Sequence, residues 1–263
     1  MYDFEFEKPS SISDAITLLS SEEAMPLSGG QTLIPALKQR LNAPSKLVSL
    51  AGIPELRGVS VNEGGMLEIK GATTHAVIAK QASSHYPALS ALASHIGDPA
   101  VRNRGTIGGS LANNDPAACY PAAVLASNGK IISNKREINS EDFFQGMFTT
   151  ALDEGELITA VQFEIPTVAN YQKFLQPASR FALTGVFVAK FDSGVRVAIT
   201  GASENGVFRW SEAEALLSDN FSPSSLDVLT FSTDGLISDL HGTPAYRASL
   251  IKTLTKRAVI AAK

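Results

Sequence analysis

Two polar loops, each containing an adjacent pair of glycines, are the segments of this sequence best suited to binding a ligand. They are residues 28–32 (Ser-Gly-Gly-Gln-Thr) and residues 105–110 (Gly-Thr-Ile-Gly-Gly-Ser). Adjacent glycines permit positive φ angles and remove the Cβ atoms that would keep a ligand away from the backbone. Successive N–H groups in such turns can converge on an anion. Each pair alone is also the ordinary signal of a tight turn, but two such loops together indicate a site for an anionic ligand.

Missing motifs narrow the kind of ligand. No two glycines in the sequence are separated by a single residue, so the G-x-G-x-x-G fingerprint cannot occur. The G-x-x-x-x-G-K-[ST] and G-x-S-x-G motifs are absent as well. These absences weigh against a Rossmann dinucleotide site, a P-loop NTPase and a serine hydrolase of the nucleophile-elbow type.

The net charge of the chain and its few cysteine and histidine residues exclude several classes of function. The chain of 263 residues has 22 Lys and Arg against 26 Asp and Glu, so it offers no broad basic surface for nucleic acid or anionic lipid. A polyphosphate would then be held by backbone N–H groups more than by lysines. The single cysteine, Cys119, cannot form an internal disulfide or carry an iron–sulfur cluster by itself. No catalytic or metal-binding role is assigned to the four widely spaced histidines, His75, His85, His95 and His241.

No targeting or membrane segment is expected. The sequence begins without the basic region and apolar core of a signal peptide, and no apolar run approaches the roughly 20 residues that span a bilayer. Hydrophobic residues make up 44% of the chain, which is enough for one or two cores. We therefore expect a cytoplasmic globular protein that has no transmembrane segment.

Short alternating elements are expected around the first loop. Ser11-Ile-Ser-Asp14 is a variant of the capping box and predicts a helix that begins there. A short segment at 25–27 precedes the loop, and an amphipathic stretch at 33–41 follows it. Residues 46–50 and 66–71 alternate like strands. The first fifty residues are therefore expected to form a small α/β unit.

The second loop is expected to lie between helices. Residues 73–97 show a helical pattern before it. Asp115-Pro116 predicts the start of a further helix after it, with Asp as the cap and Pro at the first helical position. A strand is expected at 157–165, and the character of the chain changes near 167–172. That change predicts a domain boundary.

The C-terminal part has its own pattern. Residues 183–191 and 195–202 predict a hairpin whose turn is Asp192-Ser-Gly194. Two helical patterns follow, the last at about 246–261. Strands followed by helices are typical of a small α+β domain.

At the two glycine loops the sequence resembles a known family. Residues 28–35 resemble the A-G-G-x-S-L-x-P pyrophosphate loop of the FAD-binding (medium) subunits of molybdenum hydroxylases, of the carbon monoxide dehydrogenase and xanthine dehydrogenase type. Residues 96–109 resemble the second flavin loop of these subunits, and residues 114–117 continue it. Residues 155–158 and 177–182 resemble later signatures of the family. The length, motif order and spacing agree over essentially the whole chain.

The resemblance implies an α+β fold. Residues 1–168 would form an FAD-binding domain of the PCMH or vanillyl-alcohol-oxidase type, with subdomains at about 1–52 and 53–168. Residues 169–263 would form a small C-terminal domain like that of carbon monoxide dehydrogenase flavoproteins. FAD would lie extended between the two N-terminal subdomains.

The resemblance also implies a set of cofactor-binding residues, but no catalytic or metal-binding ones. The two loops would contact the pyrophosphate and its surroundings. Phe181 falls where relatives can place an aromatic ring beside the isoalloxazine, although a core phenylalanine fits the same pattern. The implied residues are Ser28, Gly29, Gly30, Gln31, Thr32, Leu33, Ile96, Thr106, Ile107, Gly108, Gly109, Ser110, Asn114, Asp115, Leu157, Ile158, Lys173 and Phe181.

One position departs from the family pattern. Relatives often have an Asp ten residues after the second glycine pair, where it accepts hydrogen bonds from the FAD ribose, but here the residue is Cys119. A thiol is a weak acceptor, so this contact is expected to be weakened or replaced by water. Cys119 also fits a small buried helix residue. Asp115 either replaces some of the lost polarity or caps a helix, and Arg102 and Arg104 are either phosphate-neutralising or solvated loop charges.

The function implied is that of a relay subunit in a hetero-oligomer. A large partner subunit would carry the molybdenum cofactor and hydroxylate the substrate. A small subunit with [2Fe-2S] centres would pass the electrons to the FAD of this chain, which would reduce an acceptor such as oxygen, a quinone or NAD. Two alternatives stay open: a stand-alone FAD-dependent oxidoreductase, which would need its own acid–base groups, and a non-enzymatic assembly protein that has lost FAD.

Overall fold

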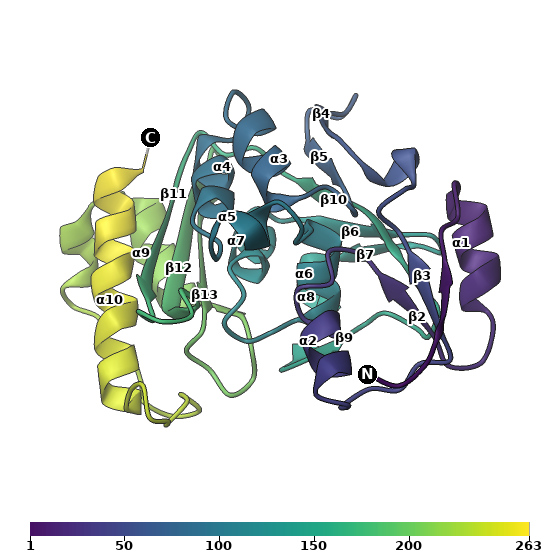
Figure 1. The fold of residues 1–263 in the computed structure, drawn as a ribbon. Coiled ribbons are helices and arrows are strands. Elements are labelled where there is room, and N and C mark those ends of the chain that lie inside the picture. Colours follow the sequence, from purple (N-terminus) through teal and green to yellow (C-terminus); the bar gives the residue numbers. More distant parts are fainter. Residues whose placement is uncertain (263) are drawn as a thin grey trace.

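The computed structural model describes residues 1–262, and its strands form sheets of three, five, four and two strands (Figure 1). The three larger sheets follow one another across the molecule, from the N-terminal region to the C-terminal helix. Within the described residues, no helix is both long enough and apolar enough to cross a bilayer.

The N-terminal region is a parallel three-stranded sheet in the order β1-β3-β2. Its first helix begins where the sequence predicts, because Ser11 Oγ accepts a hydrogen bond from the backbone N–H of Asp14 at 3.1 Å. The expected α/β unit is thus confirmed. Its elements are β1 (Glu5–Glu7), α1 (Ile12–Leu19), β2 (Ala24–Leu27), α2 (Leu33–Lys38) and β3 (Lys46–Ser49).

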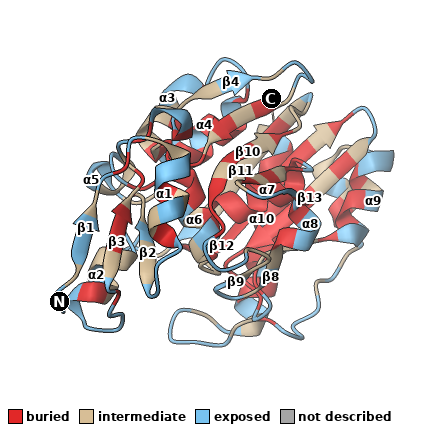
Figure 2. Ribbon diagram, turned by 90° about the vertical axis from the view of Figure 1, so that its right-hand side faces the viewer, coloured by how far each residue is buried: buried red, intermediate tan, exposed pale blue. Residues whose placement is uncertain are grey.

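The middle region is an antiparallel sheet in the order β4-β5-β10-β6-β7 with short helices packed on it. Helix α7 is buried along its whole length (Figure 2), because it packs against the C-terminal sheet and belongs to the core of the middle region. The elements of the region are η1 (Pro54–Leu56), β4 (Val59–Val61), β5 (Leu67–Lys70), α3 (His75–Gln81), α4 (Pro87–Ser94), α5 (Pro99–Arg102), α6 (Ile107–Asn113), α7 (Tyr120–Ala126), β6 (Lys130–Ser133), β7 (Glu137–Asn139), α8 (Ser140–Phe143), β8 (Phe144–Gly146), β9 (Thr149–Thr150) and β10 (Ile158–Phe163).

The C-terminal region is an antiparallel sheet that is covered on both faces. Its central strand has alternate residues in two different cores: Phe187 and Ala189 pack with the middle region, whereas Val186 and Val188 pack with α9 and α10. Figure 1 shows the sheet between α4 and α7 on one side and α9 and α10 on the other. The elements are β11 (Val168–Leu175), β12 (Ala182–Phe191), β13 (Gly194–Thr200), β14 (Phe208–Arg209), α9 (Ser211–Asp219), η2 (Pro223–Leu226) and α10 (Pro244–Ala261).

Two helix predictions were wrong in detail. The pattern at 73–97 is two helices, α3 and α4, because Pro87 can begin a helix but cannot continue one. Asp115-Pro116 does not begin a helix: Asp115 Oδ1 accepts a hydrogen bond from Ala117 N at 2.8 Å within a turn, and α7 begins at Tyr120. The predicted hairpin is confirmed as β12 and β13.

The division into domains at residue 168 stays a prediction. The predicted boundary coincides with the start of β11. The core of the middle region continues past it, through Ala169, Phe187 and Ala198. The two parts therefore share a core.

Candidate functional site

The two glycine loops lie against each other although they are far apart in the sequence. Ser28 Oγ and Thr106 Oγ1 are 2.7 Å apart and share a hydrogen bond. A Cβ atom on Gly29 would collide with the carbonyl oxygen of Arg104 and lie 2.6 Å from Gly105 Cα. Glycine is therefore required at position 29 by the close approach of the loops themselves.

The second loop is bound firmly to the chain beneath it. A Cβ atom on Gly108 would lie 2.6 Å from the carbonyl oxygen of Gly71. The first N–H groups of α6 all donate within the chain, so they are not free for a ligand. These bonds run from Ile107 N to Thr73 O (3.2 Å), from Gly108 N to Gly71 O (2.9 Å), from Gly109 N to Thr106 Oγ1 (3.2 Å) and from Ser110 N to Thr106 O (3.0 Å).

The first loop keeps its donors free. Among the described residues, none accepts a hydrogen bond from the backbone N–H groups of residues 29–33. Gly30 has a φ angle of +70°, in the left-handed region that favours glycine and lets neighbouring N–H groups converge. The capacity to bind an anion through the backbone is thus concentrated in this loop.

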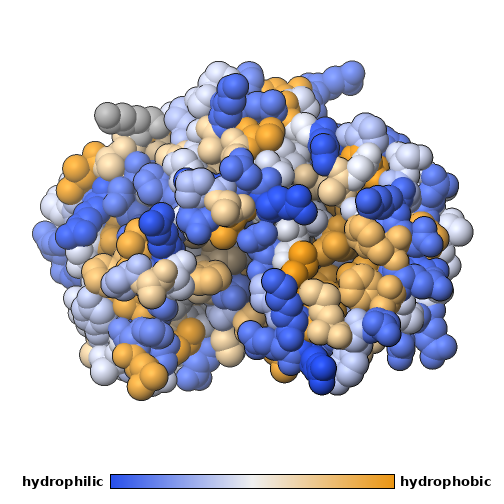
Figure 3. Space-filling model, viewed as in Figure 1, coloured by the Kyte–Doolittle hydropathy of each residue, from blue (hydrophilic) through white to orange (hydrophobic). Residues whose placement is uncertain are grey.

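A cavity of about 520 Å³ opens beside the loops. Its size is typical of a site for a small molecule or cofactor. Figure 3 shows the surface hollowed between the region of β11–β13 and the region of α2 and β2. All the residues implied by the family resemblance line this cavity except Ile107 and Asn114.

These two residues have structural roles within the chain, and neither lines the cavity. Ile107 is fully buried in the core of the middle region. Asn114 ends α6 in the left-handed conformation, with a φ angle of 43°. Its Nδ2 donates to the carbonyl oxygens of Gly146 (2.8 Å) and Thr149 (2.9 Å). It therefore holds the β8–β9 hairpin instead of lining the cavity.

The departure at Cys119 lies on the cavity wall. Cys119 is 6% exposed and precedes α7, so it is buried as one interpretation expected. Its Sγ accepts a contact of 3.6 Å from Lys173 Nζ. The same ammonium group donates to the carbonyl oxygens of His95 (2.8 Å) and Arg180 (3.0 Å). Lys173 therefore ties β11 to two neighbouring loops.

The arginines of the second loop differ in role. Arg102 donates from one nitrogen to the carbonyl oxygens of Ile96 (3.1 Å) and Gly97 (2.9 Å), so it braces the loop that carries Ile96. Arg104 is exposed. Arg102 therefore stabilises the cavity wall from within the chain.

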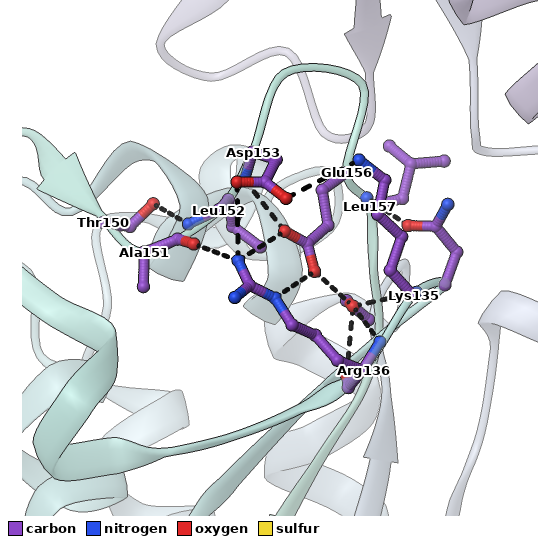
Figure 4. A network of polar contacts seen from close by, with 10 residues as sticks. Lys135, Arg136, Thr150, Ala151, Leu152, Asp153, Glu156 and Leu157 are labelled. Carbon is purple, nitrogen blue, oxygen red and sulfur yellow. Dashed lines mark hydrogen bonds and ion pairs between the residues drawn. The ribbon is translucent and has the colours of Figure 1, made fainter.

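A buried carboxylate lies beside Leu157 at the cavity wall (Figure 4). The Glu156 side chain is fully buried and accepts hydrogen bonds from Ser133 Oγ (2.5 Å), Asp153 N (2.8 Å) and two nitrogens of Arg136 (3.1 and 3.2 Å). Burial raises the pKa of Glu156, but the hydrogen bonds from Arg136, Asp153 and Ser133 outweigh it and lower the pKa to about 2. This network holds the turn before Leu157, which lines the cavity.

His75 is a cavity residue that sequence reasoning missed. It begins α3 and is only 5% exposed, and its Nδ1 lies 3.2 Å from Tyr120 Oη. Burial, followed by the charge of Arg102, lowers its pKa to about 4. No spacing in the sequence marks it, because its neighbours in the cavity come from the second loop.

The paired loops, the free N–H groups and the largely apolar cavity define a cofactor-binding protein. The family model described as "FAD binding domain in molybdopterin dehydrogenase" matches residues 2–167. The chain belongs to this family, and its cofactor is FAD.

Relatives of known function match the chain over nearly its full length. It is 33% identical to the nicotine 6-hydroxylase medium subunit of Paenarthrobacter nicotinovorans, over 98% of this chain and 96% of that one. It is 30% identical to the carbon monoxide dehydrogenase medium chain of Afipia carboxidovorans, over 99% and 96%. A solved structure of CO dehydrogenase from Oligotropha carboxidovorans superposes with a TM-score of 0.89 at 29% identity, covering 98% and 96% of the two chains. The expected FAD-binding fold is confirmed.

The cavity fits FAD on its own geometry. Five consecutive free N–H groups suit a pyrophosphate, which needs several donors and little side-chain charge. Leu157, Ile158 and Ile96 supply apolar walls suited to an aromatic ring. Phe181 is 47% exposed at the cavity, so it is not a core phenylalanine.

Proposed function

We propose that this chain is the FAD-carrying subunit of a molybdopterin-containing dehydrogenase or hydroxylase. It forms a hetero-oligomer with a large subunit that holds the molybdenum cofactor and a small subunit that holds [2Fe-2S] centres. Its relatives are named as medium subunits and chains of such enzymes, and it spans 96% of their length. The lone Cys119 supports the division of labour, because a cluster needs several cysteine ligands. A cytoplasmic location is part of the proposal and suits a chain without disulfides.

In this proposal, the chain binds and orients the cofactor. The N–H groups of residues 29–33 hold the pyrophosphate, while Ser28 and Thr106 fix the two loops to each other. Ile96, Leu157, Ile158 and Phe181 enclose the flavin ring and exclude water. Bound FAD supplies the redox chemistry: it accepts electrons singly or in pairs and passes them to an acceptor. No acid–base residue of this chain needs to touch the organic substrate.

The free donors of the first loop carry the proposal, and a charge substitution tests them. Gln31 is exposed on the cavity and donates only to the carbonyl oxygen of Gly29, at 3.3 Å. Gln31→Glu places a negative charge beside the pyrophosphate, so we expect FAD to bind about tenfold more weakly. Fluorescence titration of the apo-protein measures this. Gln39→Glu, at the exposed far end of α2, is the matched control and should leave the affinity unchanged.

Two further measurements test the relay. The purified chain should contain one FAD per polypeptide by its visible spectrum and by chromatography of the released cofactor. It should also co-purify with iron–sulfur and molybdenum subunits. Steady turnover of a small substrate by the isolated chain would favour the stand-alone oxidoreductase, whereas a colourless chain that takes up no FAD would favour the assembly protein.

A further inference from the structure

One ring nitrogen of His75 has a hydrogen-bond partner within the protein, and the other has none among the described residues. Its Nδ1 faces Tyr120 Oη at 3.2 Å, and the two rings lie with their centroids 5.3 Å apart. No hydrogen-bond partner of Nε2 is found among the described residues. The histidine lines the cavity although the residue is only 5% exposed, so its free nitrogen is accessible to a ligand in the cavity.

Tyr120 determines which nitrogen carries the proton. Tyr120 is fully buried, and burial raises its pKa well above the usual value, so the phenol keeps its hydrogen. Among the described residues, His75 Nδ1 is the one hydrogen-bond partner of this hydroxyl group. A buried O–H group that donates to nothing is costly, so Tyr120 donates to Nδ1. The neutral imidazole must then hold its own proton on Nε2.

Gly105 packs against the edge of the ring that carries Nε2. A Cβ atom on Gly105 would lie 2.6 Å from Nε2, and Gly105 itself lines the cavity. Any other residue at position 105 would collide with the imidazole and displace it. Gly105 also packs against Gly29, so Nε2 lies close to the loop that carries the free N–H groups.

We propose that the Nε2–H group of His75 donates a hydrogen bond to an oxygen atom of FAD, either in the pyrophosphate or at a carbonyl of the flavin ring. Tyr120 is the positioning residue that keeps the proton on Nε2. The inference rests on the proposed function, since it needs FAD in this cavity. It gives His75 a binding role and no part in proton transfer.

Two substitutions separate the two ring nitrogens. In His75→Asn, the side-chain amide takes the place of Nδ1 toward Tyr120, but nothing reaches the position of Nε2. In His75→Gln, the amide reaches the position of Nε2 and restores a donor. We expect FAD to bind about tenfold more weakly to His75→Asn, because one hydrogen bond is lost, and to regain most of its affinity in His75→Gln. His85→Asn, at an exposed histidine outside the cavity, should bind like the wild type.

Spectroscopy identifies the acceptor and tests the role of Tyr120. ³¹P NMR of bound FAD should shift in His75→Asn if the acceptor is a phosphate oxygen, and the infrared carbonyl bands of the flavin should shift if it is a ring carbonyl. ¹⁵N NMR of the imidazole should show a proton on Nε2 in the wild type and a mixture of tautomers in Tyr120→Phe.

The outcomes are distinct. Suppose that the wild-type chain binds FAD, and that the folded His75→Asn protein binds it with equal affinity and unchanged phosphorus and carbonyl signals. This result overturns the inference about His75 and leaves the proposed function standing. If His75→Asn does not fold, the ¹⁵N spectrum of the wild type decides. A proton on Nδ1, or a spectrum that does not change when FAD is added, overturns the inference about His75. A wild-type chain that takes up no FAD rejects the proposed function and the inference with it.

Discussion

At the scale of single residues, the glycines and the asparagine near the cavity act mainly by shaping the backbone. Gly29 and Gly108 are required because other backbone segments occupy the space of a Cβ atom. A valine at either position would disturb the packing of the loops before it could test ligand binding. Asn114 likewise holds a hairpin, so its substitution separates stability from cofactor binding.

Asn114→Ala should destabilise the protein without affecting FAD binding. The change removes two hydrogen bonds to β8 and β9 and places alanine at a left-handed position, so we expect a loss of about 2 kcal/mol in the free energy of unfolding. Urea unfolding and FAD titration measure the two effects. If Asn114→Ala instead loses FAD affinity while its stability is unchanged, Asn114 must be assigned to the FAD-binding site.

At the scale of elements, the network around Glu156 stabilises the turn between β9 and β10. Hydrogen bonds hold the pKa of Glu156 at about 2 in the folded chain, below the ordinary value of 4.5. The network's contribution to stability is therefore full above pH 4.5 and is lost as the pH falls from 4.5 toward 2.

This pH dependence is the prediction for Glu156→Gln. The wild-type melting temperature should fall more steeply than that of the variant between pH 5 and about pH 2, because Glu156 binds a proton in the unfolded wild type there but stays ionised in the folded one, whereas glutamine does not titrate. At pH 7 the variant should be the less stable of the two. Parallel slopes in melting curves recorded across this range would show that Glu156 does not contribute in this way.

The elements also show which features the sequence could predict. The hairpin β12–β13 was predictable because its turn, Asp192-Ser-Gly194, is a local signal. The start of α7 was missed because Asp115 and Pro116 form a turn with the same residue types as a helix cap. The contact of Ser28 with Thr106, and the place of His75, depend on packing between distant segments, which no local spacing encodes.

At the scale of the whole molecule, β12 joins two cores. Phe187 packs against Tyr86 and Tyr171 on one face, while Val186 and Val188 face α9 and α10. Glu141 of α8 adds ion pairs to Arg196 (2.8 Å) and Arg209 (2.6 Å) of the same sheet. The predicted domains at 1–168 and 169–263 therefore share a hydrophobic core and are joined by ion pairs.

Calorimetry should accordingly show one unfolding transition for the chain. Phe187→Ala removes a fully buried ring from the shared core. It should therefore lower the free energy of unfolding of the whole chain by about 3–5 kcal/mol, and the chain should still unfold in one transition. Two separate heat-absorption peaks, with only one moved by the substitution, would show that the domains unfold independently.

The second glycine loop has a consequence for the maturation of the enzyme. The N–H groups of residues 107–110 donate to Gly71, Thr73 and Thr106, all within the chain itself. This part of the site is therefore formed before FAD arrives, whereas the N–H groups of residues 29–33 have no acceptor among the described residues. We expect the newly made chain to fold without its flavin and to be loaded afterwards, so that cofactor supply limits the yield of active enzyme and not the survival of the polypeptide.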